Sequence, residues 1–108
     1  MAGKLIYQTK EVKEFANAMS VSAFRKYNVA LQLLKDTGVL SYPLAEKVEG
    51  RRNLFEIRIL SEDNESFFYC YDTGTVVYVI HAFEKKTRKT PPREIEKALA
   101  IRRRLLGN

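Results

Sequence analysis

Two charged side chains share one face of a predicted strand, where they could act on an anionic substrate. Period-two alternation over residues 54–60 places Glu56 and Arg58 on the same face and leaves the apolar residues between them on the other. A planar guanidinium suits phosphate oxygens, and a carboxylate can transfer protons. A solvated sheet face that carries a weak ion pair is the simpler interpretation of this strand taken alone.

A dense cationic segment follows the last predicted strand. His81, the only histidine, lies near the end of that strand, where an imidazole that titrates near neutrality could move a proton. Both faces of the strand are apolar, so alternation does not fix the direction of His81, and a lone histidine is more often structural. The basic side chains that could contact phosphates are Lys85, Lys86, Arg88 and Lys89 in the segment, Arg93 in the following helix, and Arg51 and Arg52 before the charged strand.

The positive charge of the chain is concentrated at one end. The 108 residues carry a formal net charge of +6. Residues 1–83 hold ten basic and ten acidic side chains, so the entire excess lies in residues 84–108. A basic block of this kind indicates an anionic partner, which can be nucleic acid, an acidic protein segment or a lipid surface. Aromatic residues on the adjacent strands, which can stack on bases, favour RNA.

Length and composition exclude several classes of protein. The chain has the size of one compact domain over residues 1–108, and no apolar run approaches the roughly 18 residues that span a membrane. A single cysteine, Cys70, excludes an internal disulfide and fits a reducing compartment. With one histidine besides, the chain has too few ligands for a structural zinc site. We therefore expect a cytoplasmic protein without metal or cofactor.

Hydropathy and turn residues predict elements in the order β-α-α-β-β-β-α. Thr9 and either Ser20 or Ser22 are suited to cap the first two helices, and Gly38 to end the second. Thr90 is expected to cap the last helix, with a proline at its first position. The predicted helices cover residues 9–19, residues 20–37 and a segment that starts at 90. The predicted strands cover residues 4–8, 54–60, 66–72 and 75–83. Residues 39–50 are predicted to form a loop.

The short turns between the last three strands indicate antiparallel neighbours. The predicted fold class is therefore α+β, with an N-terminal helical hairpin packed on a small antiparallel sheet and a C-terminal helix. Arg102 projects near the middle of the apolar side of that helix. Its side chain is expected either to extend past the sheet edge into solvent or to reach into a site.

Two segments resemble a known family. Residues 50–58, GRRNLFEIR, resemble the G-x-x-x-L-x-E-L-R strand of HigB-like toxins in the RelE/ParE superfamily. Residues 80–98, IHAFEKKTRKTPPREIEKA, are similar to their L-H-x-F-x-K-K-T-x-K-T-P-x-x-E-I-x-x-A ending. The two motifs occur in the family's order and spacing, whereas the N-terminal hairpin agrees with the family in architecture only.

This resemblance implies a RelE-like fold and the toxin of a type II toxin–antitoxin pair. Many HigB-like members are ribosome-dependent endoribonucleases that cut mRNA by metal-free attack of a ribose 2′-OH on the adjacent phosphate. In that reaction Arg58 would stabilise the phosphorane, and Glu56 and His81 would transfer protons in either order. Lys85 and Lys86 would hold phosphates of mRNA or rRNA. The implied partners are the ribosome with its mRNA and a cognate antitoxin, expected to be a small helix-turn-helix protein.

One residue departs from the family pattern. The strand over 66–72 commonly opens with arginine, as in R-x-F-Y-x-x-D, whereas this chain has Ser66. Two outcomes are open: the lack of this phosphate ligand weakens or abolishes cleavage, or Arg51, Arg52 or Arg102 substitutes for it. Two alternatives stay open: a ParE-like toxin that inhibits DNA gyrase without cutting RNA, and a basic binding module without activity.

Overall fold

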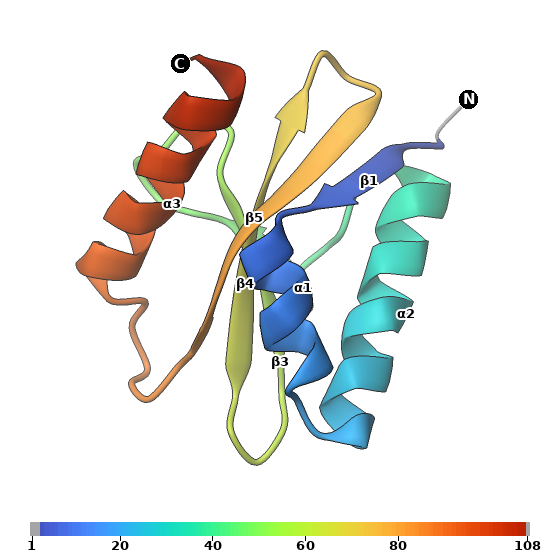
Figure 1. Cartoon of the computed structure of the whole chain (residues 1–108), viewed down its shortest axis with the longest axis vertical. Coiled ribbons are helices and arrows are strands. Elements are labelled where there is room, and N and C mark those ends of the chain that lie inside the picture. The colour runs from blue at the N-terminus through green and yellow to red at the C-terminus, as the bar shows by residue number, and fades with distance from the viewer. Residues whose placement is uncertain (1–2, 108) are drawn as a thin grey trace.

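The computed structural model describes residues 3–107 and confirms the α+β fold class (Figure 1). Its elements follow one another in the predicted order, with one additional short strand. They are β1 (Leu5–Gln8), α1 (Lys10–Asn17), α2 (Val21–Thr37), β2 (Ala45–Lys47), β3 (Phe55–Ile59), β4 (Glu65–Asp72), β5 (Val76–Glu84) and α3 (Pro92–Leu106).

The five strands form one sheet in the order β1-β5-β4-β3-β2. Strands β3, β4 and β5 are antiparallel neighbours, as their short turns predicted. Two expectations were wrong. The sheet is mixed rather than wholly antiparallel, because β1 pairs in parallel with β5. The segment 39–50, predicted as a loop, contributes the edge strand β2, which has only three residues and so shows no alternation.

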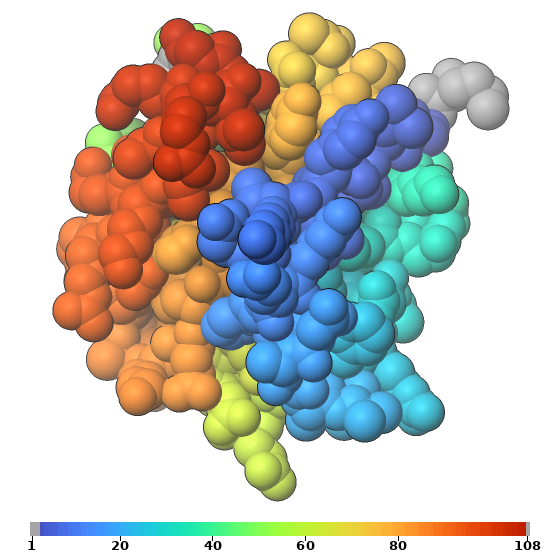
Figure 2. Space-filling model, in the orientation of Figure 1, coloured from blue at the N-terminus to red at the C-terminus, as the bar shows by residue number. Residues whose placement is uncertain are grey.

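Helices cover both faces of the sheet, with α1 and α2 on one face and α3 on the other (Figure 1). On the first face the ring of Tyr27 stacks on that of Phe67 with the centroids 3.9 Å apart. The second face packs Leu54, Phe68 and Ile80 against Ala98 of α3. Among residues 3–107, no helix is long and apolar enough to cross a membrane. Figure 2 shows the turn between β3 and β4 projecting from one end of the molecule.

The start of α2 decides between the two serines that could cap it. Ser20 has extended backbone angles, and its hydroxyl accepts a hydrogen bond of 3.1 Å from the amide of Ala23. Replacing Ser20 with alanine should lower the free energy of unfolding by about 1 kcal/mol, because that amide loses its partner. Ser22 is exposed inside the first turn. Ser22→Ala is the matched control and should change stability by no more than about 0.5 kcal/mol in urea unfolding.

The single cysteine lies in the core beneath α3. Burial raises the pKa of the Cys70 thiol to about 11, so almost none of it is thiolate at pH 8. Because the thiolate is the reactive form, modification by Ellman's reagent at pH 8 should be roughly 100-fold slower for the folded chain than for the chain in 6 M guanidinium. Equal rates in the two solvents would show that Cys70 is accessible in the native state.

Candidate functional site

The charged face of β3 points toward α3. Alternation was predicted correctly: Ile57 and Ile59 pack beneath α1 and α2, while Glu56 and Arg58 lie on the opposite face. In the sheet register, Glu56 is opposite Phe68 of β4 and Arg58 is opposite Ser66. The interpretation of this face as solvated was wrong for Glu56, whose residue surface is only 3% exposed.

A network of three donors surrounds the carboxylate of Glu56. The hydroxyls of Ser66 and Thr90 each donate to it at 2.7 Å, one to each oxygen. The ammonium of Lys85 donates to the Ser66-bound oxygen at 3.2 Å and to the Thr90 hydroxyl at 3.0 Å. Since a buried charge is tolerated only with such partners, Glu56 fixes Lys85 in place, and each of its oxygens already accepts at least one hydrogen bond.

The same network overturns the role predicted for Thr90. The residue that precedes the first turn of α3 is Pro91, and α3 has no side-chain cap. The Thr90 hydroxyl is engaged with Glu56 and Lys85 instead. A residue that fits the helix-start pattern therefore belongs to the site, and it joins the entry of α3 to β3.

The guanidinium of Arg58 lies beside this network and is more open to solvent. It forms an ion pair of 2.7 Å with Glu46 of β2, and its side chain is 32% exposed. Its Nε atom is buried and has no hydrogen-bond partner among the described residues. Because that atom has almost no accessible surface, the terminal nitrogens of the guanidinium are the donors that an anion can reach, and one of them pairs with Glu46.

Two adjoining clefts open at Arg58. One has a volume of about 360 Å³ and the other about 300 Å³, and both are lined by Arg58, Lys85 and Arg88. Lys89 lines the second cleft as well. The concentration of basic residues makes these clefts suited to the phosphates of a nucleic acid. We refer to them together as the Arg58 clefts.

The remaining predicted phosphate ligands lie outside the Arg58 clefts. Arg51 pairs with Glu96 of α3 at 2.7 Å, while the side chains of Lys86 and Arg93 extend into solvent. The backbone carbonyl of Arg52 accepts a hydrogen bond from Arg102. Arg102 also donates to the carbonyl of Asn53 at 3.2 Å. It therefore holds the loop before β3, and neither of the two expectations for it describes this contact.

His81 is separated from Arg58 by aromatic rings. A bulge leaves Ile80 without a partner in β4. As a result, Ile80 and His81 both pack on the face of the sheet that α3 covers. The His81 ring stacks beside Phe68, the residue that also faces Glu56, and its Nε2 lies 2.7 Å from a carboxylate oxygen of Glu94. The structure thus brings Glu56, Arg58 and Lys85 together but places His81 in another hollow, between α1 and α3.

Sequence reasoning missed the carboxylate that contacts Arg58. Glu46 lies in the segment predicted as a loop, so no alternation marked the side on which it projects. Ser66, noted only as a missing arginine, is buried and donates to Glu56. Within residues 3–107, no three His, Cys, Asp or Glu side chains are gathered as ligands for a metal ion.

Comparison with known proteins finds one family and one fold. A family model described as phage-derived protein Gp49-like matches residues 14–103. No curated protein has a significantly similar sequence. Solved structures of the same fold include a doubly substituted free form of the E. coli toxin RelE, with a TM-score of 0.68 and 12% identity over 91% of this chain and 96% of that one.

Two further structures agree with that match. The isolated E. coli RelE toxin gives a TM-score of 0.64 at 11% identity, over 88% of this chain and 98% of that one. The archaeal RelE–RelB complex from Pyrococcus horikoshii OT3 gives 0.61 at 16% identity, over 82% and 100%. At these identities the likeness establishes a RelE-like fold.

Proposed function

This chain belongs to the family of phage-derived Gp49-like proteins, and we propose that it is the toxin of a type II toxin–antitoxin pair. Its proposed activity is that of a HigB-like, ribosome-dependent mRNA endoribonuclease in the cytoplasm, which inhibits translation until a cognate antitoxin binds. The match to a RelE toxin solved with RelB supports an antitoxin partner, and a small helix-turn-helix protein from a neighbouring reading frame is the expected one.

The observation that carries this proposal is the Arg58 guanidinium at two clefts that Lys85 and Arg88 also line. Lys85 lies next to it, fixed by the Glu56 carboxylate. Donors that are fixed before the substrate arrives stabilise charge as it develops and need no reorganisation during the reaction. Phosphoryl chemistry on RNA, whose transition state gains charge at the phosphate, is the reaction that such an arrangement suits.

In the proposed reaction, the ribose 2′-OH attacks the adjacent phosphorus and loses its proton. The bond from phosphorus to the 5′-oxygen breaks, and that oxygen takes up a proton, which leaves a 2′,3′-cyclic phosphate and a 5′-OH. Arg58 binds the phosphate oxygens of the phosphorane, and Lys85 and Arg88 add positive charge. Both oxygens of Glu56 are already engaged by donors of the chain, and His81 lines another hollow. Glu46, which contacts Arg58, is therefore the candidate base.

The direct test is controlled induction of the chain in bacteria, with mapping of mRNA 5′ ends. The proposal predicts growth arrest within minutes and new ends inside translated codons, since the ribosome presents the mRNA. Arrest with intact mRNA and an induced DNA-damage response would instead support the gyrase alternative. Expression without arrest and without new ends would contradict both activities.

A further inference from the structure

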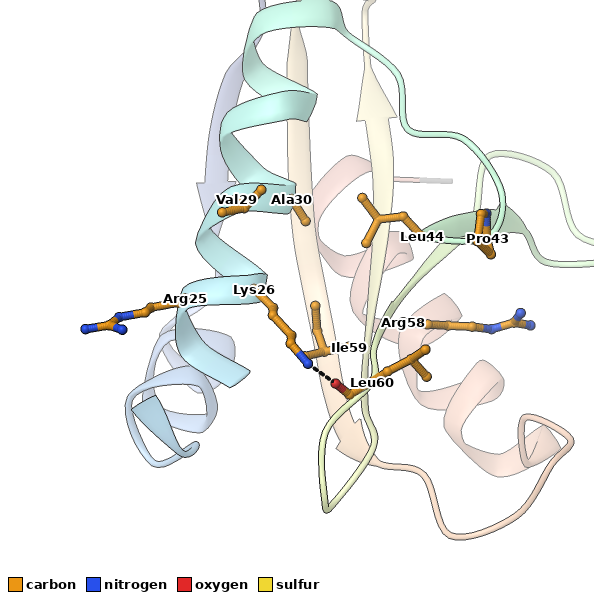
Figure 3. A pocket seen from close by; sticks show the side chains of 9 residues that line it. All are labelled: Arg25, Lys26, Val29, Ala30, Pro43, Leu44, Arg58, Ile59 and Leu60. Atoms are coloured by element: carbon orange, nitrogen blue, oxygen red, sulfur yellow. Dashed lines mark hydrogen bonds between the residues drawn. The ribbon is translucent and has the colours of Figure 1, made fainter. Parts of the chain in front are cut away.

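An apolar hollow lies on the opposite side of β3 from the Arg58 clefts. It has a volume of about 550 Å³ and runs between α2 and the chain around Pro43, with Ile59 and Leu60 along its floor (Figure 3). The apolar side chains that line it are Val29, Ala30, Pro43, Leu44, Ile59 and Leu60. We call this hollow the α2–β3 groove.

The groove exposes much more apolar surface than a closed core does. Val29 is 67% exposed and Leu60 is 71% exposed. Leu33, four residues after Val29 on α2, is also exposed, whereas Arg25 occupies the position four residues before Val29. Exposed apolar side chains that line a groove are typical of a site that another protein covers.

Every charged residue that lines the groove is basic. These residues are Arg25 and Lys26 of α2 and Arg58 of β3. The ammonium of Lys26 donates to the carbonyl of Leu60 at 2.6 Å and crosses one end of the groove, while Arg25 points out to solvent (Figure 3). An apolar floor between basic side chains is complementary to an amphipathic segment that carries carboxylates at its edges.

The groove is continuous with the Arg58 clefts. Arg58, Ile59 and Leu60 line both the groove and the larger cleft. The side chain of Arg58 starts at the edge of the groove and points away from α2 (Figure 3). A segment that lies in the groove and continues past Leu60 would therefore bring its next residues to the guanidinium.

We propose that the α2–β3 groove binds an amphipathic, acidic segment of a protein partner, whose apolar side chains cover Val29 and Leu60 and whose following Asp or Glu pairs with Arg58. Such a segment would compete for the guanidinium that otherwise binds phosphate and would fill the entrance beside Leu60. The inference rests on the proposed function in one respect: the partner is the antitoxin, and its place in the groove is how it blocks the site.

The experiment is a calorimetric titration of the purified full-length chain with the protein encoded by the neighbouring reading frame. Val29→Glu and Leu60→Glu place a negative charge where the partner's apolar side chains would lie and should weaken binding about tenfold or more. Val39→Glu is the matched control, because Val39 is 60% exposed but does not line the groove. It should bind within about twofold of the unsubstituted chain.

Thermal unfolding of the free variants checks that they fold, which is expected because all three side chains are exposed. Equal affinity of all three variants would overturn the groove assignment and leave the toxin proposal standing. No binding by the unsubstituted chain would overturn both the groove and the antitoxin partner. A dimer of the free chain that Val29→Glu dissociates would assign the groove to a second copy and overturn the proposal.

The proposed RNase activity is tested by a separate measurement, the cleavage of mRNA after induction of the chain. Induced Val29→Glu should still cut mRNA, because Val29 lies outside the Arg58 clefts, but co-expression of the neighbouring protein should no longer restore growth. Restored growth with Val29→Glu would contradict the groove assignment. Absence of mRNA cleavage by the unsubstituted chain would contradict the proposed activity, while the titration would still decide the groove.

Discussion

Replacement of Arg58 by alanine is expected to slow mRNA cleavage about 10²–10³-fold on programmed ribosomes. The loss removes a guanidinium that lines both clefts together with Lys85 and Arg88 and that contacts Glu46, the candidate base. Its side chain is partly exposed, so the fold should tolerate the change. The rate is measured by primer extension on a defined mRNA at saturating ribosome concentration.

Two variants separate the chemistry of Arg58 from its charge. Arg58→Lys keeps the charge but loses the planar pair of donors, so its rate should lie between those of the alanine variant and the unsubstituted chain. Arg103→Ala removes an exposed arginine of α3 and the same unit of charge, and it should keep the full rate. Equal losses in Arg58→Ala and Arg103→Ala would mean that net charge, rather than Arg58, matters.

Replacement of Glu56 by alanine is expected to lower the free energy of unfolding by about 3 kcal/mol. The substitution leaves the ammonium of Lys85 and the hydroxyls of Ser66 and Thr90 without their common acceptor in a nearly closed environment. Cleavage should fall as well, because Lys85 is no longer fixed beside Arg58. Urea unfolding measures the first effect, and the slope m should stay unchanged if the folded state remains compact.

The matched control for Glu56 is the exposed Glu49, whose replacement by alanine should cost no more than about 0.5 kcal/mol. Glu56→Gln keeps the shape and an acceptor oxygen, so it should destabilise less than Glu56→Ala. A Glu56→Ala variant as stable as Glu49→Ala would show that the buried network contributes nothing net to folding. In that case Glu56 would have no structural role, and its assignment as the anchor of Lys85 would fail.

The helices were predictable because their signals are local. Ser20 and Gly38 are each read from a few neighbouring residues, and the structure puts α2 between them. The alternation in β3 was equally local. The parallel pairing of β1 was not, because it depends on where two helices return the chain and not on the residues of the strand. The bulge that orients His81 depends on the register between β4 and β5, so the residues of β5 alone do not indicate it.

The residues of the site were predictable from the sequence, but the hydrogen bonds between them were not. Residue types and spacing singled out Glu56, Arg58 and Lys85, and the structure brings the three together. Their roles depend on residues 10 to 34 positions after Glu56, so the sequence could not show that both oxygens of this carboxylate accept hydrogen bonds from the chain itself. Glu46 stayed hidden because a three-residue edge strand has no pattern.

The structure also shows which arginines line the Arg58 clefts in a chain that lacks the family arginine at position 66. None of the expected substitutes, Arg51, Arg52 and Arg102, lines the Arg58 clefts, whereas Arg88 lines both. The serine at position 66 takes part in the site through Glu56 rather than through phosphate. We infer that Arg88 supplies the charge that the family arginine would bring.

If the Arg58 clefts direct attack of a ribose 2′-OH on its own phosphate, cleavage must depend on that hydroxyl. The purified chain is incubated with ribosomes programmed by an mRNA whose codon in the A site carries either ribose or 2′-deoxyribose. We expect the ribose mRNA to be cut to a 5′-OH product and the deoxyribose mRNA to stay intact. Equal cleavage of both, or a 5′-phosphate product, would contradict it.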